Sequence, residues 1–474
     1  MRHATTILLA ILGATGAAAA QAVLGSLAET KPAEPQPEVI RLKAAPAAEP
    51  RPALTWLLLP EYLDQTPGNA AQLYYLAEQH VPSGKAAHEW EVKISEWLRT
   101  PLEKLPREQI RSATDHYSSA LRQVELAARR ERCLWDLPIR SEGYRLIIPA
   151  MSKYRTLARV LCLKARLHTA DGRCDKAVHE LQTGLAMARH FAAGPTLIHS
   201  LVGTAIASVL LEQVDTLIQA PGSPNLYWAL TGLPRPFVSL RDSMECERST
   251  LYLHFSQLRK PGPAGLTPQQ WQAVMNGLWQ LMAEEAPPAE ADLRNLAVSV
   301  YMYPRAKRFL IAQGSKPAEV EAMPVQQVIG AYCLDVYEQN RDEIFKWFNV
   351  PYWQAGDGME RSAVVLQEAT KRHKGNPFLA LLPSLSRAYF LTTKLDRKIA
   401  ALRCIEAVRM HAAAHGGQPP AELSEIQLVP IPADPITGKG FGYKVVGDTV
   451  MLEAPAPPGG SPDDELRYEL TLTK

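Results

Sequence analysis

Apolar and small residues recur at helical spacing from Arg155 to Leu217, and this stretch constrains the fold more than any other. The spacing i, i+3, i+4, i+7 predicts an amphipathic helix between Ala150 and Ala170, because such residues share one helix face. Gly172 can close that helix in the left-handed conformation, and a second helix is predicted from Cys174. Small residues on both helices favour close antiparallel packing: Ala158, Ala165, Ala177 and Ala188.

The predicted hairpin resembles the tetratricopeptide repeat, in which a Gly before the second helix and an Ala near its start serve a close approach of the two helices. Gly172 precedes the second predicted helix here. The resemblance implies an antiparallel array of helices. The helix that follows, Leu197 to Gln219, is longer and more apolar than a third repeat unit.

This third helix raises the question of a membrane span. The uncharged run from Phe191 to Leu211 approaches the length that a bilayer needs. Gly194-Pro195 interrupts the run, and Ser, Thr and His side chains are scattered through it. We therefore expect a helix buried by its neighbours on several sides, and no stable membrane span in the mature chain.

The N-terminus predicts export. A short basic start at Met1-Arg2-His3 precedes an apolar stretch, Ile7 to Leu12, and a small-residue exit, Gly16 to Ala22. This order is typical of a secretory signal peptide, predicted over residues 1–20. The alternative is an uncleaved anchor, because apolar residues continue to Leu27. The protein is expected in the periplasm or outside the cell, with anchoring by the N-terminal segment as the alternative.

Residues 21–53 are rich in Pro and Ala, a composition that predicts a disordered tether. Residues 54–383 then show one helical pattern after another and no strand pattern, which predicts an all-α body. Residues 384–474 differ. A long amphipathic helix from Ser384 to His415 ends at Gly416-Gly417, and period-two alternation around Gly447-Asp448 predicts a β-hairpin. Alternation from Tyr468 to Leu472 adds a third strand. The fold class is therefore mainly α: a tetratricopeptide-like antiparallel helical array with a small C-terminal α+β module.

The C-terminal module also resembles the C-terminal domain of type II secretion major pseudopilins over about Leu385 to Leu452. The features that carry this resemblance are the long helix, an Asp-Pro-x-x-Gly turn and an aromatic residue in the hairpin: Asp434, Pro435, Gly438 and Tyr443. The resemblance implies structural roles for these positions. The pilin-type N-terminal processing site joined to a hydrophobic helix is missing, so a filament subunit is not inferred.

The body resembles a family of uncharacterised exported bacterial proteins from Leu54 to about Leu251. Three segments carry this resemblance: Pro67-Gly68-Asn69-Ala70-Ala71, Trp135-Asp136-Leu137-Pro138 and Asn225-Leu226-Tyr227-Trp228-Ala229-Leu230. The resemblance implies export and brings no activity.

Two clusters are candidate ligand-binding sites. The first combines guanidinium groups with an indole, and such groups bind carboxylate or phosphate and stack on aromatic faces: Arg129, Arg130, Trp135 and Arg140. The second places adjacent aromatics on a short helix, where an exposed platform would suit a carbohydrate or peptide: Asn225, Tyr227 and Trp228. The competing interpretation is structural in both cases, with the arginines capping helices and the aromatic residues filling the core.

Other chemistry is not indicated. The net charge is +2 and basic residues are interspersed with acidic ones, so no nucleic-acid partner is expected. His411 and His415 stand at i, i+4 without a third ligand nearby, so no metal is predicted. The sequence contains no Gly-rich phosphate loop and no nucleophile elbow, and we expect no cofactor.

The favoured function is an exported, non-enzymatic helical scaffold that binds a peptide, a protein or an envelope polymer. One alternative is an envelope hydrolase or lyase that acts on an acidic polymer. Another is an assembly component associated with secretion pseudopili.

Overall fold

The protein is described by a computed structural model, which places residues 39–146, 148, 151–259, 265–282, 288–383 and 385–473. The predicted signal peptide and the first part of the predicted tether, up to residue 38, lie outside these residues. The described chain is mainly helical with a small sheet near the C-terminus.

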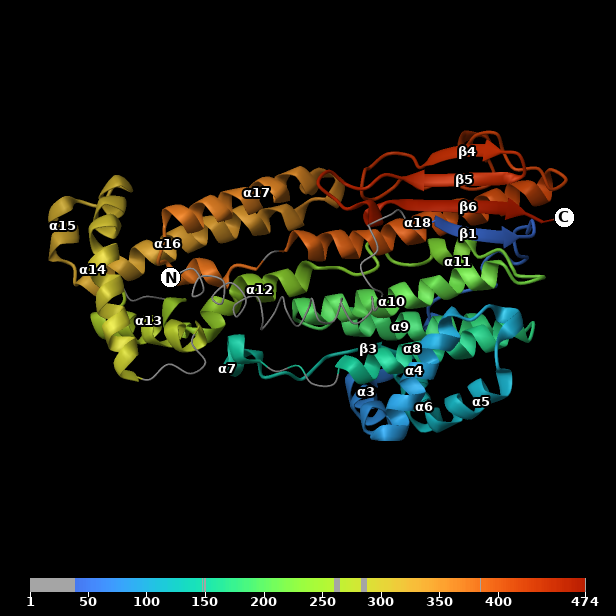
Figure 1. Cartoon of the computed structure of the whole chain (residues 1–474), viewed down its shortest axis with the longest axis horizontal. Helices are drawn as coiled ribbons and strands as arrows, with labels where there is room; N and C mark the ends of the chain where they lie inside the picture. The colour runs from blue at the N-terminus through green and yellow to red at the C-terminus, as the bar shows by residue number, and fades with distance from the viewer. Residues whose placement is uncertain are drawn as a thin grey trace.

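The helices before α18 fall into two groups along the chain, one before residue 235 and one between residues 241 and 372 (Figure 1). The first group is α3 (Ala70–Gln79), α4 (Lys85–Arg99), α5 (Arg107–His116), α6 (Ser118–Ala128), α7 (Ile139–Glu142), α8 (Met151–Ala170), α9 (Cys174–Ala192), α10 (Leu197–Ile218) and α11 (Tyr227–Thr231). The second group is α12 (Arg241–His254), α13 (Pro268–Met282), α14 (Pro288–Ala312), α15 (Pro317–Ala322), α16 (Val325–Phe345) and α17 (Tyr352–Arg372). The longest helix, α18 (Ser386–Ala414), follows.

The predicted helical hairpin is formed by α8 and α9, with Gly172 at φ +70° in the turn between them. α10 then packs against α9 and α8. A Cβ at Gly203 of α10 would lie 2.6 Å from the carbonyl oxygen of Ala188, so glycine lets these two backbones approach closely. By length and composition α10 could cross a bilayer, yet 72% of its most apolar window is buried inside the protein.

Four strands form the sheet in the order β1-β6-β5-β4. They are β1 (Val39–Ala44), β4 (Gly442–Val446), β5 (Thr449–Ala454) and β6 (Leu466–Leu472). β4, β5 and β6 are antiparallel, which confirms the predicted hairpin and third strand. A separate two-stranded sheet pairs β2 (Thr66–Asn69) with β3 (Arg130–Arg132).

The tether prediction is wrong from Val39 onward, because β1 pairs in parallel with β6 along its whole length. The chain after β1 is also held. The backbone N–H of Ala47 donates to the carbonyl oxygen of Arg409 on α18, at 3.1 Å. The N-terminal residues of the described chain are therefore part of the fold.

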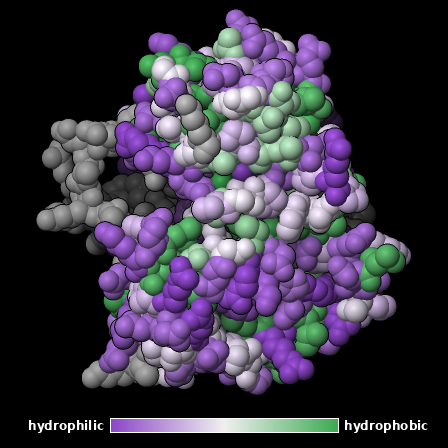
Figure 2. Space-filling view, turned by 90° about the vertical axis from the view of Figure 1, so that its right-hand side faces the viewer, coloured by the Kyte–Doolittle hydropathy of each residue, from purple (hydrophilic) through white to green (hydrophobic). Residues whose placement is uncertain are grey.

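Two hydrophobic cores divide the molecule, and their division does not follow the predicted boundary at residue 384. One core contains the inner face of the sheet, α18, α3 to α6 and α8 to α11. The other contains α12 to α17. The chain leaves the first core after Val238 and returns to it along α18 at Leu395, so α12–α17 form an insertion at one end of an elongated molecule (Figure 1). At the opposite end, hydrophobic residues are scattered among hydrophilic ones (Figure 2).

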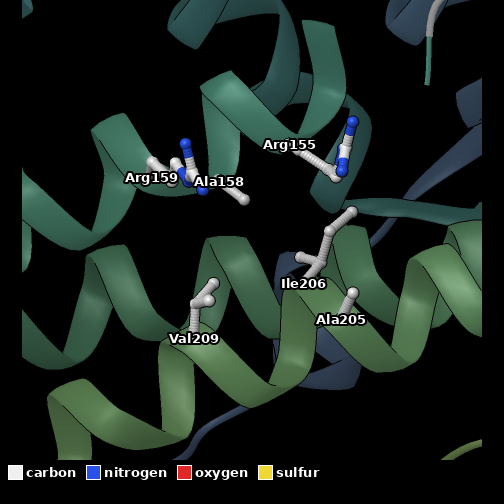
Figure 3. A pocket seen from close by; sticks show the side chains of 6 residues that line it. All are labelled: Arg155, Ala158, Arg159, Ala205, Ile206 and Val209. Atoms are coloured by element: carbon white, nitrogen blue, oxygen red, sulfur yellow. The ribbon is translucent and has the colours of Figure 1, made fainter. Parts of the chain in front are cut away.

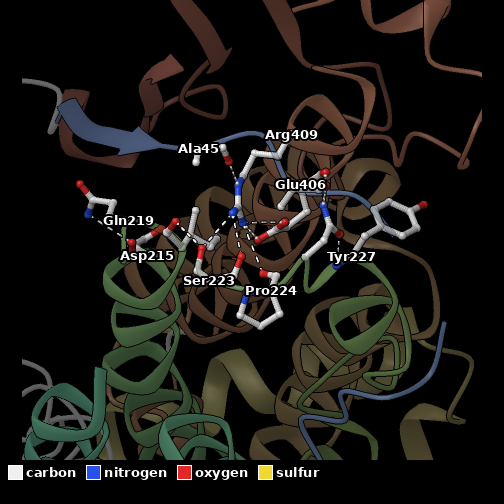
Figure 4. Close-up of polar contacts among 11 residues, drawn as sticks. Ala45, Asp215, Gln219, Ser223, Pro224, Tyr227, Glu406 and Arg409 are labelled. Atoms are coloured by element: carbon white, nitrogen blue, oxygen red, sulfur yellow. Dashed lines mark hydrogen bonds and ion pairs between the residues drawn. The ribbon is translucent and has the colours of Figure 1, made fainter. Parts of the chain in front are cut away.

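Buried arginines join α18 to the rest of the first core. Arg397 and Asp434 have side chains that are 1% exposed, and their guanidinium and carboxylate groups form two hydrogen bonds of 2.7 and 2.8 Å. Arg409 is equally buried and pairs with Glu406 at 2.9 Å. It also donates to the carbonyl oxygens of Ala45 and Ser223 (Figure 4).

We predict that Arg397→Met destabilises the fold by about 3–5 kcal/mol, because it leaves the Asp434 carboxylate buried without its ionic partner. Urea unfolding followed by circular dichroism measures this. The double variant Arg397→Met/Asp434→Asn should lose less stability than Arg397→Met alone. Arg41→Met, which breaks an exposed pair with Glu469, is the matched control and should cost about 0–1 kcal/mol. Equal losses for Arg397→Met and Arg41→Met would contradict a structural role for the buried pair.

Candidate functional site

The first predicted cluster starts at the two-stranded sheet. Arg129 ends α6, and its guanidinium donates to the carbonyl oxygen of Glu125 and lies within hydrogen-bond distance of the His179 ring. Arg130 begins β3 and donates to the carbonyl oxygen of Pro67 on β2. These two arginines therefore have structural partners, as the competing interpretation predicts.

Trp135 belongs to the core and not to an exposed platform. Its ring stacks on Tyr74 with centroids 5.9 Å apart and contacts Phe191 at 4.7 Å. Its Nε1 donates to the carbonyl oxygen of His190 at 3.0 Å. The expectation that Trp135 forms one site with the neighbouring arginines is not met, because its indole is held among buried aromatic rings.

Arg140 is exposed on α7, which packs against α12 and lies apart from β3 (Figure 1). The structure brings Arg129 and Arg130 together and leaves Arg140 separate from them.

The second predicted cluster is also largely a fold determinant. Asn225 is buried and donates to the carbonyl oxygens of Ala47 and Glu406, while its side-chain oxygen accepts from the N–H of Tyr227. Tyr227 is buried and its hydroxyl donates to the carbonyl oxygen of Pro430. The prediction that Asn225 and Tyr227 form an exposed ligand-binding platform is wrong, because both side chains are buried and their polar groups form hydrogen bonds inside the core.

Trp228 differs from its neighbours because it is only partly buried. Its Nε1 donates to the Glu49 carboxylate at 2.6 Å, which ties the segment after β1 to α11. Its ring lies edge-on against the Tyr227 ring, with centroids 5.1 Å apart, so the two adjacent aromatic residues pack on each other.

A different pair of arginines lines a small hollow between α8 and α10 (Figure 3). Arg155 and Arg159 stand one helical turn apart on α8, on either side of Ala158. The opposite wall is apolar and comes from α10: Ala205, Ile206 and Val209. The helix spacing explains the arrangement, because residues four positions apart share one face.

The electrostatics of this hollow are cationic. Partial burial, followed by the charge of Arg159, lowers the pKa of the Arg155 guanidinium, and the Glu91 carboxylate acts in the opposite direction. Glu91 also accepts a hydrogen bond from the Thr156 hydroxyl at 2.8 Å, and Arg159 donates to the Ser95 hydroxyl at 3.4 Å. An anionic group would reach the two guanidinium groups only at the edge of the hollow, because the hollow is small and the surface that it exposes is almost wholly apolar.

Sequence reasoning missed this pair. Residues 127–140 have a higher local density of charge, whereas Arg155 and Arg159 stand in a helix whose pattern is dominated by its apolar face. The usable signal was their i, i+4 spacing on an otherwise apolar and small-residue helix.

Metal ligation finds no support among the described residues, where no group of three His, Cys, Asp or Glu side chains is placed to hold an ion. His411 and His415 stack with ring centroids 3.9 Å apart. The Asp434 carboxylate is occupied by Arg397 and by the hydroxyl of Thr437 at 2.8 Å.

Comparisons with protein-family models, with curated proteins and with solved structures give no match for this chain.

The aromatic cluster around Trp135 makes a pH-dependent prediction. Burial lowers the pKa of His190 and of His199 to about 4. An unfolded histidine binds its proton near pH 6.5, so between pH 6.5 and 4 the unfolded state takes up protons that the folded state does not. The free energy of unfolding should therefore fall as the pH falls through this window, by on the order of 3 kcal/mol for each histidine.

The variant His199→Phe keeps a ring in the cluster and removes one of the two titrations. We expect a shallower loss of stability between pH 6.5 and 4, measured by urea unfolding at several pH values. Asp396 contributes the opposite slope, because burial raises its pKa to about 7, so the comparison is made between variants. The exposed His88, changed to Gln, is the matched control and should leave the slope unchanged. An unchanged slope in His199→Phe would contradict the prediction.

Proposed function

We propose that the chain is an exported, non-enzymatic helical scaffold that binds an acidic peptide or protein segment through the hollow between α8 and α10. The observation that carries this proposal is the pair Arg155 and Arg159, which faces the apolar residues of α10 across the hollow. An envelope polymer that bears carboxylates would meet the same contacts.

The chemistry of the hollow supports a carboxylate ligand. Guanidinium groups bind carboxylates through paired, charge-assisted hydrogen bonds. Two arginines one turn apart repel each other, and an anion between them relieves this repulsion. The apolar wall formed by Ile206 and Val209 suits an aliphatic stem next to the charged group.

A tetratricopeptide-like arrangement around α8, α9 and α10 is part of the proposal. Its support is the short turn at Gly172 and the burial of small residues where these helices meet, such as Ala158 and Ala188. Stacked helices of this kind offer surfaces between helices to extended ligands. Export rests on the N-terminal sequence pattern.

The two alternatives have unequal support. The hydrolase or lyase hypothesis would have to act through the two predicted clusters, yet their residues Trp135 and Tyr227 are both held by hydrogen bonds in the core. The secretion-assembly hypothesis has one favourable observation. The Asp434 turn, with Gly438 at φ +70°, is joined to the long helix α18 by the Arg397–Asp434 ion pair.

The test is binding of fluorescein-labelled acidic peptides, and of a uronic-acid polymer, followed by fluorescence anisotropy. We expect Arg155→Gln/Arg159→Gln to weaken binding by roughly 100-fold or more, because two charge-assisted contacts are removed and each contributes about 1.5–3 kcal/mol. Circular dichroism checks that the variant is folded.

The exposed cations Arg122 and Lys176, changed together to Gln, form the matched control, because they remove the same charge from the same unit. This control should bind like the parent protein. Equal weakening in both variants would show a nonspecific charge effect and would overturn the assignment of the site, as would the absence of binding to any acidic ligand.

A further inference from the structure

A run of basic residues ends α17 and is not used by the hollow between α8 and α10. Lys371, Arg372, His373 and Lys374 follow one another at the C-terminal end of this helix. Lys371, Arg372 and Lys374 are exposed, whereas His373 is partly buried. Cations at this end of a helix are favourable, because the helix dipole is negative there.

α14 brings further cations to the same place. Arg305 and Arg308 are exposed on α14, and the Arg305 guanidinium lies 4.5 Å from the centre of the Tyr301 ring. A Cβ at Gly375, just after the basic run, would lie 3.9 Å from the same ring. The turn that ends α17 therefore lies on α14 beside Tyr301.

His373 shows that the two groups of cations form one patch. Its Nδ1 shares a hydrogen bond of 2.7 Å with the Tyr332 hydroxyl. Burial lowers the pKa of this imidazole first, and the charges of Arg372 and Arg305 lower it further. The His373 ring also lies 6.2 Å from the Phe309 ring of α14, so the C-terminal end of α17 packs on α14. The basic end patch is defined as Arg305, Arg308, Lys371, Arg372 and Lys374.

An exposed aromatic side chain lies beside these cations, and an exposed aliphatic residue precedes it in the chain. Val300 is 71% exposed and Tyr301 is 46% exposed. Glu368 is exposed one turn before Arg372 and is the acidic side chain of α17 nearest to the basic run. The cation of Lys307 on α14 is paired with Glu321 at 2.8 Å, so it is not counted in the patch. The patch is therefore cationic, with an aromatic and an aliphatic group at its side.

We infer that the basic end patch docks the protein on the surface of an anionic lipid bilayer. The patch lies at one end of the elongated molecule, where α14 and the C-terminal end of α17 meet, and this position allows contact with an extended surface (Figure 1). Juxtaposed cations attract anionic headgroups, and a tyrosine with an aliphatic neighbour suits the interface between headgroups and acyl chains. This contact is peripheral and requires no membrane span.

The experiment is flotation of the full chain with vesicles of phosphatidylcholine that contain 30 mol% phosphatidylglycerol, compared with vesicles of phosphatidylcholine alone. The measured quantity is the ratio of the partition coefficients for the two kinds of vesicle. Every variant carries the same N-terminal segment, so a difference in this ratio between variants reports on the patch. We expect preference for the anionic vesicles, and we expect this preference to fall in 0.5 M NaCl because salt screens the attraction.

The triple variant Lys371→Gln/Arg372→Gln/Lys374→Gln should reduce the anionic preference by roughly a hundredfold, since each cation near such a surface contributes about fivefold. Tyr301→Ser should weaken binding to anionic vesicles by several-fold while leaving the salt dependence in place. The control Arg122→Gln/Lys176→Gln removes exposed cations from the other unit and should have little effect. The same control serves the acidic-peptide assay, so the two sites are separable.

Three results would overturn the inference. One is equal partition into neutral and anionic vesicles. Another is a triple variant that partitions like the parent protein. The third is binding of soluble polyglutamate at the patch without binding of anionic vesicles, which would assign this surface to an acidic protein partner instead.

Discussion

The buried guanidinium group of Arg409 joins three segments of the first core. It is paired with Glu406 on the preceding turn of α18, and it also donates to carbonyl oxygens of two distant segments, at Ala45 and at Ser223 (Figure 4). Burial raises the pKa of the Glu406 carboxyl, which shows how poorly the site is solvated. A buried charge persists only when its hydrogen-bonding groups are satisfied, so the segment after β1 and the loop after α10 must both be in place around α18.

The same helix explains how the insertion is held. Just before α12, the backbone N–H of Phe237 donates to the Asp396 carboxylate on α18 at 2.9 Å. From within the insertion, Glu247 on α12 accepts from the N–H of Leu197 at the start of α10. Burial raises the pKa of both carboxyls. The Glu247 carboxylate thus ties the insertion to α10 in addition to apolar packing, while the Phe237–Asp396 hydrogen bond fixes the point at which the chain leaves the first core.

The local sequence pattern was sufficient to predict the helices and the hairpin around Gly447. A hydrophobic period of 3.6 or 2 residues and a turn residue can both be recognised within a short segment of the sequence. It was insufficient for β1. Its six residues follow a Pro- and Ala-rich segment, and its partner β6 lies more than 400 residues away in the sequence, as the Arg41–Glu469 contact shows. The sequence pattern also fails to predict the burial of Arg397. A charged residue on a long helix is expected to be exposed to solvent unless its buried partner, here Asp434, is known.

The candidate sites show the same limit from the functional side. Dense clusters such as residues 127–140 and 225–228 attract attention because they contain arginines and aromatics, yet the structure uses Trp135 and Tyr227 to join segments of the core. By contrast, Arg155 and Arg159 stand beside a hollow on one helix face, where the charge of each disfavours the other. The sequence shows the spacing of these two arginines on α8, but it does not show the apolar wall that faces them, because that wall comes from α10. A site of this kind becomes visible only when the two helices are packed together.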